Sequence, residues 1–187
     1  MPERNLDFGK FGARGIKGHE AVARQLDALA GYIATPVTVH RGLLARLHYL
    51  TRSDHARAAA RAAGLTVMDR TVRAWLAGTR TPSRKNLAAI EQAYRTVRRE
   101  NVARYLLARL NRGTRVEIHP LNQSQVDRPH QRTMEYRAMN VRHWDRIVAA
   151  WAADDDQGLD DAWVDQLADL GSQWGQYEYV TNIGFAA

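Results

Sequence analysis

The stretch that decides the fold is residues 53–101, which read SDHARAAARAAGLTVMDRTVRAWLAGTRTPSRKNLAAIEQAYRTVRREN. An alanine-rich segment at residues 55–63 predicts a helix that ends at Gly64, because glycine accepts the left-handed conformation that closes many helices. A second short helix is predicted at residues 68–76, just before Gly78. Two short helices with a glycine between them, the second rich in arginine and threonine, are typical of a helix-turn-helix.

The predicted second helix has two faces of different chemistry. Val72, Trp75 and Leu76 lie three and four positions apart, so they share one face, and we expect that face to be buried. The other face and the turn that follows are polar and basic, which predicts contact with double-stranded DNA. The candidate DNA-binding residues are Asp69, Arg70, Thr71, Arg73, Arg80, Thr81, Ser83, Arg84 and Lys85.

Charge divides the chain into a basic and an acidic part. Residues 1–115 carry 22 Lys and Arg against 8 Asp and Glu, whereas residues 116–187 carry 5 against 12. Only three of the 27 basic residues are lysine, and arginine is the residue suited to bidentate contacts with phosphate and guanine. Arginine enrichment from a GC-rich genome would give the same composition. The helix-turn-helix pattern inside the basic part therefore decides in favour of a salt-sensitive nucleic-acid contact.

Composition also limits where the protein acts. The chain contains no cysteine, which excludes disulfides, thiolate metal sites and cysteine nucleophiles. No apolar run approaches the roughly 18 residues of a membrane helix, and the N-terminal residues lack the apolar core of a signal peptide. We therefore expect a cytoplasmic, nucleoid-associated protein with no membrane partner.

No constellation of residues in the sequence indicates catalysis. The seven histidines show no ligand spacing, and no glycine-rich phosphate loop follows a predicted strand. An acidic group partly resembles a calcium loop but lacks its terminal glutamate, and it is interpreted as a solvated linker with charges at a helix N-terminus. This group consists of Asp154, Asp155, Asp156, Asp160 and Asp161. We expect no metal, no cofactor and no enzymatic activity.

The sequence predicts three regions, and the first two, residues 1–18 and 19–112, lie in the basic part of the chain. Residues 1–18 predict a flexible basic arm, which is either a disordered tail or an arm that reaches into a DNA groove. Residues 19–112 predict a helical DNA-binding domain. Besides the two motif helices, this domain should contain helices at residues 19–33 and 40–49 and a long helix capped by Ser83.

The long helix after Ser83 carries apolar residues at helical spacing. It either continues to Leu110, which gives about 27 residues, or bends near Glu100. Trp75, Tyr94 and Tyr105 all fall at core spacing, so we expect them to pack in the core rather than stack on bases.

Residues 113–187 predict a small α+β domain, because the hydrophobic pattern changes from the helical period to alternation after Gly113. About three strands are expected, at residues 114–120, 133–141 and 176–185, together with helices at residues 143–153 and 160–170. The polar segment 121–132 predicts a loop. The expected fold class is thus mainly α: an N-terminal helical bundle with a helix-turn-helix, plus a small C-terminal α+β unit.

Part of the chain resembles a known family. The segment LTVMDRTVRAWLAGTRTPSRKNLAAIEQAYRTVRREN is similar to the central block of the telomere terminal proteins of linear actinobacterial chromosomes and plasmids. The resemblance extends through TRVEIHP, LNQSQVDRPHQR and TMEYRAM, then on to a helical pair and a final strand. It implies a protein that caps and primes replication of telomeric DNA ends by covalent attachment to the 5′ end, with a telomere-associated protein and a DNA polymerase as partners.

The resemblance also implies a site for the covalent linkage. In the family the linked hydroxyl belongs to a threonine after the first C-terminal strand, and the corresponding region here offers Ser124 and Thr133. Ser124 is the first candidate because it lies in the most polar part of the loop, between two glutamines. Thr133 begins a predicted strand, and Thr114 follows the helix end at Gly113, so both are expected to be less mobile.

Other interpretations of the same sequence stay open. The core RTVRAWLAGTRTPS is shared with many repressor-like helix-turn-helix proteins, so a transcriptional repressor with a C-terminal dimerisation or effector domain is the main alternative. A third interpretation is an interaction module whose arginine surface binds an acidic protein. The sequence also leaves open whether the protein forms a homodimer.

Overall fold

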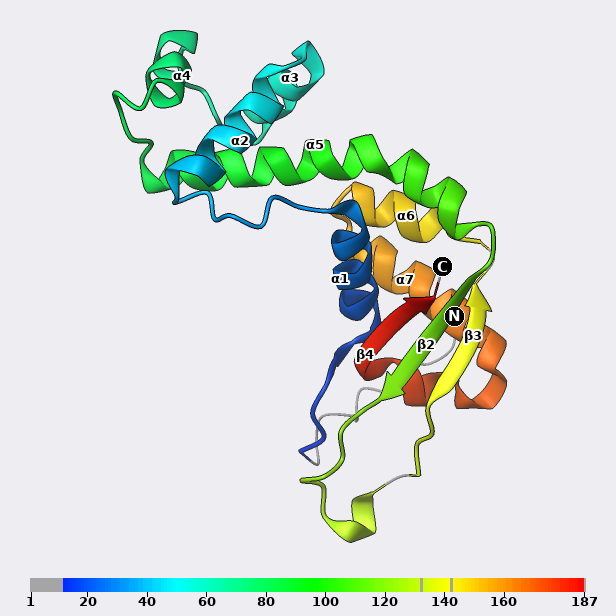
Figure 1. Cartoon of the computed structure of the whole chain (residues 1–187). Helices are drawn as coiled ribbons and strands as arrows, with labels where there is room; N and C mark the ends of the chain where they lie inside the picture. The colour runs from blue at the N-terminus through cyan, green and yellow to red at the C-terminus, as the bar shows by residue number, and fades with distance from the viewer. Residues whose placement is uncertain (1–11, 132, 142, 187) are drawn as a thin grey trace. The chain divides into compact units, whose positions relative to one another are not determined.

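The computed structural model describes residues 12–131, 133–141 and 143–186 and has two compact units (Figure 1). Residues 30–102 form the first, which we call the helix-turn-helix unit; the described residues before 30 and after 102 form the second, the sheet unit. The fold is mainly helical, with a small antiparallel sheet in the C-terminal part, which confirms the expected fold class. Among the described helices, none combines the length and apolar character that a membrane crossing requires.

The helix-turn-helix unit is built on one core. Buried side chains from four helices meet in it, and Ile90, Tyr94 and Trp75 are each at most 3% exposed. The four helices are α2 (His40–Thr51), α3 (Asp54–Ala62), α4 (Asp69–Leu76) and the first part of α5 (Arg84–Leu110). All four lie within three residues of their expected positions, and α5 is a single helix of 27 residues with no break at Glu100.

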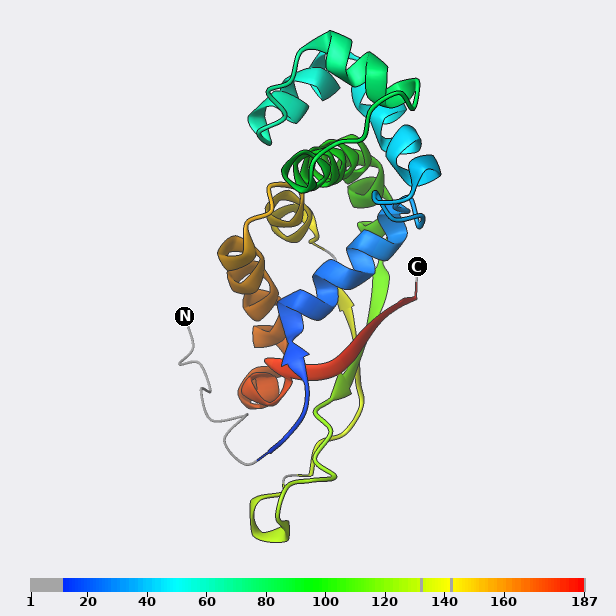
Figure 2. The same ribbon diagram turned by 90° about the vertical axis from the view of Figure 1, so that its left-hand side faces the viewer.

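The sheet unit contains a four-stranded antiparallel sheet with the strand order β1-β4-β2-β3. Helices α1, α6 and α7 lie on one side of this sheet (Figures 1 and 2). Along β2 the residues alternate: Val116 and Ile118 are buried, whereas Arg115 and His119 are exposed, so one face of the sheet is covered and the other is open. The strands are β1 (Ile16–Lys17), β2 (Thr114–Pro120), β3 (Arg137–Val141) and β4 (Tyr179–Ala186). The helices are α1 (Gly18–Ala30), α6 (Asp145–Ala152) and α7 (Asp156–Leu167), with short 3-10 segments at Arg128–His130 and Ala168–Tyr177.

Some element boundaries in the sheet unit differ from the expected ones. Strand β2 has the expected bounds. Strand β3 begins at Arg137 rather than at residue 133, because backbone pairing with β2 extends from Val141 only as far as Arg137, which pairs with Ile118. Pro120, which has no backbone N–H, ends β2 shortly afterwards. Helix α7 begins at Asp156, earlier than expected, because the Asp155 carboxylate accepts a hydrogen bond from the Gly158 N–H at 2.9 Å.

Strand β1 lies in a region expected to be a flexible arm. Residues 1–11 of that predicted arm lie outside the described residues, but Ile16 and Lys17 pair with Val180 and Tyr179 of β4. Gly15 is needed for close packing: a Cβ there would clash with the Leu121 side chain and lie 2.6 Å from the Val180 carbonyl oxygen. Gly15, inside the predicted flexible arm, thus allows a tight backbone approach.

The boundaries of the two compact units differ from those of the helical domain expected at residues 19–112. Helix α1 was grouped with the helix-turn-helix in the expected domain 19–112, but its contacts tie residues 18–29 to the sheet unit. The His19 ring lies 2.8 Å from the Asp160 carboxylate, and the Trp151 indole N–H donates to Asp27 at 2.7 Å. At the other boundary, the division falls within α5, at residues 102 and 103, rather than after residue 112.

The core prediction is right for Trp75 and Tyr94 and wrong for Tyr105, which is 69% exposed. At about 100° per residue, Tyr105 returns to roughly the same helical face as Tyr94, which is why its spacing suggested core packing. In the C-terminal half of α5, however, the buried residues are Leu106 and Leu110. These lie roughly 120–160° around the helix from Tyr94, so the buried face of α5 changes before Tyr105 is reached.

The packing at Gly15 leads to a stability prediction. We expect Gly15→Ala to lower the free energy of unfolding by about 1–3 kcal/mol, because the added methyl group must displace β4 backbone. The matched control is Gly184→Ala, whose Cβ would lie at ordinary contact distance from Glu117, 3.7 Å from its Cβ and 3.8 Å from Oε2, and should cost nothing. Urea unfolding of the full chain measures both. Equal stability of the two variants would contradict the β1–β4 packing described here.

Candidate nucleic-acid interface

Local signals define both ends of α3. At its start, the Ser53 hydroxyl accepts a hydrogen bond from the Ala56 N–H at 3.2 Å. The guanidinium of Arg57 donates to the exposed Asp54 carboxylate at 2.7 Å, and this hydrogen bond, with the attraction between the charges, lowers the pKa of Asp54. These contacts fix the first turn of α3.

Gly64 ends α3 and turns the chain toward α4. Its φ is +91°, its N–H donates to the Arg61 carbonyl, and the Leu65 N–H donates to the Ala60 carbonyl, both at 2.9 Å. This pair of hydrogen bonds is the Schellman motif, and the buried side chain of Leu65 adds the apolar contact that often accompanies it. The same arrangement recurs after α4, where Gly78 has a φ of +69°. Both glycines are required by their backbone conformation.

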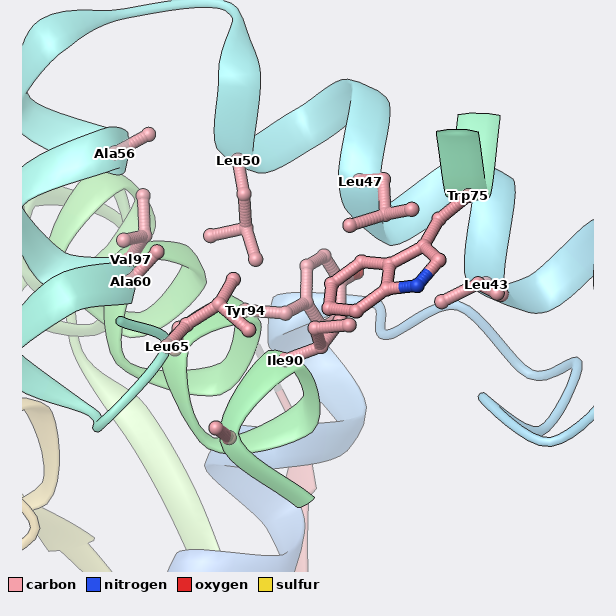
Figure 3. Close-up of a cluster of buried hydrophobic side chains, with 12 residues drawn as sticks. Leu43, Leu47, Leu50, Ala56, Ala60, Leu65, Trp75, Ile90, Tyr94 and Val97 are labelled. Atoms are coloured by element: carbon pink, nitrogen blue, oxygen red, sulfur yellow. The ribbon is translucent and has the colours of Figure 1, made fainter. Parts of the chain in front are cut away.

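The inner face of α4 is anchored by Trp75. The indole is 3% exposed and lies among Leu43, Leu47 and Ile90 from the neighbouring helices (Figure 3). Val72 and Leu76 are half-buried and pack against the same cluster. As expected from their spacing, these three residues form the buried side of the second motif helix, which fixes the orientation of its outer face.

The outer face of α4 presents charged residues to solvent. Asp69, Arg70 and Arg73 are exposed, whereas Thr71 is half-buried at the border of this face. The helix begins at Asp69 rather than at residue 68. Met68 precedes the helix as its N-terminal cap and is 60% exposed. Its side chain therefore adds an apolar group to the exposed surface at the start of α4, which the spacing of apolar residues in the sequence did not predict.

The turn after α4 and the start of α5 continue the basic surface. Arg80, Thr81, Arg84 and Lys85 are exposed, and the Ser83 hydroxyl accepts a hydrogen bond from the Asn86 N–H at 3.3 Å. The first turn of α5 contains no acidic residue, so its positive helix end is not compensated there. Among the described residues, the side chains of Arg70, Arg73, Arg80, Arg84 and Lys85 have no hydrogen-bond or ion-pair partner, which leaves their donors available to a ligand.

A buried arginine holds the segment before α2 in place. Arg46 is 4% exposed and donates to the carbonyls of Thr35 at 2.8 Å and Ile33 at 3.1 Å, while its Nε lies 2.6 Å from the Glu91 carboxylate on α5. Its guanidinium also lies over the Tyr94 ring, 5.2 Å from the centroid. Arg46 thus links α2, α5 and the chain before α2. The sequence held a signal for this role, because Arg46 occurs between Leu43 and Leu50 on the apolar face of α2.

The three candidate hydroxyls of the sheet unit differ in access. Ser124 is exposed, and its N–H donates to the Asn122 side chain at 2.9 Å, which forms a tight local turn. Thr133 is exposed and lies outside β3, contrary to the expectation that it begins a strand. Thr114 is completely buried, and its hydroxyl donates to the Leu110 carbonyl at 3.0 Å, which removes it as a candidate.

The loop that carries Ser124 is anchored at several points. Leu121 and Val126 are buried, and Asn122 exchanges two backbone hydrogen bonds with Arg14, at 2.9 and 3.1 Å. The Gln131 side chain donates to the Val126 carbonyl at 2.7 Å. The segment between β2 and β3 extends past the ends of these strands (Figure 1). Ser124 therefore lies exposed between fixed points rather than on a loop without contacts.

The acidic group of the sequence has structural partners. Asp160 is buried against His19, Asp155 caps α7, and the Asp161 carboxylate accepts a hydrogen bond from Gln157 at 3.0 Å. Within the part of the chain that the structure describes, no group of three or more histidine, cysteine, aspartate or glutamate side chains could hold a metal ion.

Comparison of the chain with models of protein families, with curated proteins and with solved structures gives no match. Its function is therefore inferred from the residues and their geometry. The exposed, unpaired basic residues of α4, of the following turn and of the start of α5 form the strongest candidate site.

The burial of Trp75 generates a prediction that separates packing from base stacking. We expect Trp75→Ala to lower the free energy of unfolding by about 3–5 kcal/mol, as truncation of a large core side chain does. The matched control, Met68→Ala, removes a large exposed side chain at the other end of α4 and should change stability by less than about 0.5 kcal/mol. Urea unfolding followed by tryptophan fluorescence and circular dichroism measures both. Unchanged stability of Trp75→Ala with loss of DNA affinity would indicate stacking on a base instead.

Proposed function

We propose that the protein binds double-stranded DNA, with α4 as the recognition helix. The observation that carries this proposal is the division of α4 into a face anchored by buried Trp75 and a face with unpaired Arg70 and Arg73. Anchored packing holds the helix rigidly, and the arginines are available to acceptors in the major groove.

The candidate residues are assigned two kinds of contact. Arg70, Thr71 and Arg73 are placed in the major groove, where an arginine can contact a guanine with two hydrogen bonds and Asp69 can accept from a cytosine amino group. Arg80, Thr81, Arg84 and Lys85 are assigned to phosphates. Ser83 joins them because its oxygen already accepts from the Asn86 N–H, which leaves its own O–H to donate to a phosphate.

We further propose that the protein is a terminal protein of linear replicons. The resemblance in residues 65–139 supports this, and so does the exposure of Ser124. In the priming step, Ser124 Oγ attacks the α-phosphorus of a deoxynucleoside triphosphate. A bond forms between the serine oxygen and phosphorus, the bond to pyrophosphate breaks, and the polymerase site takes up the hydroxyl proton. The polymerase supplies this chemistry, and the protein supplies the hydroxyl.

A transcriptional repressor is the alternative that the same helix-turn-helix supports. In that case the sheet unit would serve dimerisation or effector binding, and Ser124 would have no reactive role. The two functions share the DNA contact and differ in the hydroxyl, so they can be tested separately.

The DNA contact predicts distinct effects for groove and phosphate residues. We expect Arg70→Ala to weaken binding by about 1–3 kcal/mol and to relax sequence preference, because it removes a base contact. Lys85→Ala should weaken binding to all sequences equally and reduce the salt slope by about one, because it removes a phosphate contact. Fluorescence anisotropy with duplexes at several salt concentrations measures both. The matched control is Arg24→Ala, an exposed arginine on α1. Unchanged binding of the combined Arg70→Ala and Arg73→Ala variant would contradict the groove assignment.

The terminal-protein proposal predicts covalent nucleotide transfer to one hydroxyl. With DNA polymerase, template and radiolabelled nucleotide, we expect labelling that is lost in Ser124→Ala. Thr133→Ala is the second test, since this exposed hydroxyl is also accessible. Thr114→Val serves as a control, because the buried Thr114 hydroxyl should not react. Absence of labelling in the natural sequence, together with tight binding to an internal palindrome, would favour the repressor.

A further inference from the structure

The C-terminal half of α5 exposes a tyrosine among arginines. Tyr105 is 69% exposed, compared with 60% for Met68, 48% for Val39 and 44% for Tyr136. Arg104, Ala108, Arg109 and Arg112 are also exposed. Positions three and four apart share a helical face, and Arg112 follows in the turn after α5, where its backbone N–H donates to the Arg109 carbonyl at 3.3 Å. We call these five residues the Tyr105 stripe.

The charge of the Tyr105 stripe is not neutralised within the protein. Among the described residues, the side chains of Arg104, Arg109 and Arg112 have no hydrogen-bond or ion-pair partner. The stripe contains no acidic residue, and the nearest one before it in α5 is Glu100, whose carboxylate lies 2.7 Å from the His55 ring. Three unpaired arginines on one face attract a polyanion.

We propose that the Tyr105 stripe binds single-stranded nucleic acid. The arginines would contact phosphates, and the Tyr105 ring would stack on an unpaired base. A duplex fits the stripe less well, because its bases are stacked on each other and offer no open ring face to a side chain on a helix surface. A solvated basic face would need no aromatic residue, so the exposed ring distinguishes this surface from an ordinary one.

The length of the stripe suits a short segment of one strand. From Arg104 to Arg112 the chain advances by about 12 Å at the helical rise per residue. A stacked strand advances by about 3.4 Å per nucleotide, so the stripe spans roughly three to four nucleotides. This site lies in the sheet unit, outside the predicted duplex contact of α4, and its existence does not depend on the proposed function.

The test uses the full chain and a fluorescein-labelled oligothymidylate of about twelve nucleotides, a length within the usual site sizes. We expect Tyr105→Leu to raise its Kd roughly tenfold, and Tyr105→Phe, which keeps the ring, to bind as the natural protein does. Arg104→Gln combined with Arg109→Gln should reduce the slope of log K against log salt by about 1.4, because two phosphate contacts are lost.

Two controls separate this site from general charge and from α4. Lys17→Gln combined with Arg24→Gln removes the same charge from exposed, unpaired side chains on β1 and α1 and should change oligothymidylate binding by less than about twofold. Arg70→Ala combined with Arg73→Ala should leave oligothymidylate binding unchanged, whether or not α4 binds a duplex. Circular dichroism and urea unfolding establish that each variant is folded.

Several outcomes would overturn the proposal. One is no binding of oligothymidylate by the natural sequence, and another is equal binding by Tyr105→Leu and Tyr105→Phe. If the combined Arg104→Gln and Arg109→Gln variant lost as much affinity for duplex DNA as for oligothymidylate, the stripe would be assigned to duplex DNA. A further outcome is that sedimentation shows a dimer, that Tyr105→Leu converts the dimer to a monomer, and that oligothymidylate binding is unchanged. This result would assign the stripe to contact with a second copy of the chain. Equal displacement of the oligonucleotide by polyglutamate would assign it to an acidic protein.

Discussion

Both compact units depend on one helix, α5, and on the change of its buried face along its length. The N-terminal half places Ile90, Tyr94 and Val97 in the core of the helix-turn-helix unit, and the C-terminal half buries Leu106 and Leu110 in the sheet unit. Because the two sets are out of phase, each half has its own exposed face. The Tyr105 stripe is a direct consequence: it continues the apolar phase of the first half into a region where that phase faces solvent.

Features governed by local chemistry could be predicted from the sequence. Gly64 and Gly78 end their helices because the closing residue must adopt a positive φ, and Ser83 begins α5 because its oxygen satisfies a free N–H. Strand β2 alternates because one face of the sheet is buried. For the candidate DNA site, the same reasoning explains why Trp75 is buried and why the arginines of α4 lie on the opposite side.

Features governed by contacts between distant segments could not be predicted. Strand β1 has only two residues, too few for any periodic pattern, and Gly15 is required there by Leu121 and Val180 rather than by its own neighbours. The exposure of Tyr105 depends on where a second core takes over along α5. Arg46 interrupts the apolar face of α2 in the sequence, yet its role follows from carbonyls and a carboxylate brought to it by folding.

The division of charge along the sequence has a structural explanation. In the sheet unit several carboxylates are used within the fold: Asp160 contacts His19, Asp155 caps α7, and Asp165 pairs with Arg146. By contrast, the basic residues of α4, of the start of α5 and of the Tyr105 stripe have no carboxylate partner among the described residues. Net charge alone would allow an arginine surface that is neutralised within the protein. Since these carboxylates of the sheet unit are engaged within the fold, the unpaired arginines are the part of the charge left for an external polyanion, and the proposed binding should be sensitive to salt through counterion release.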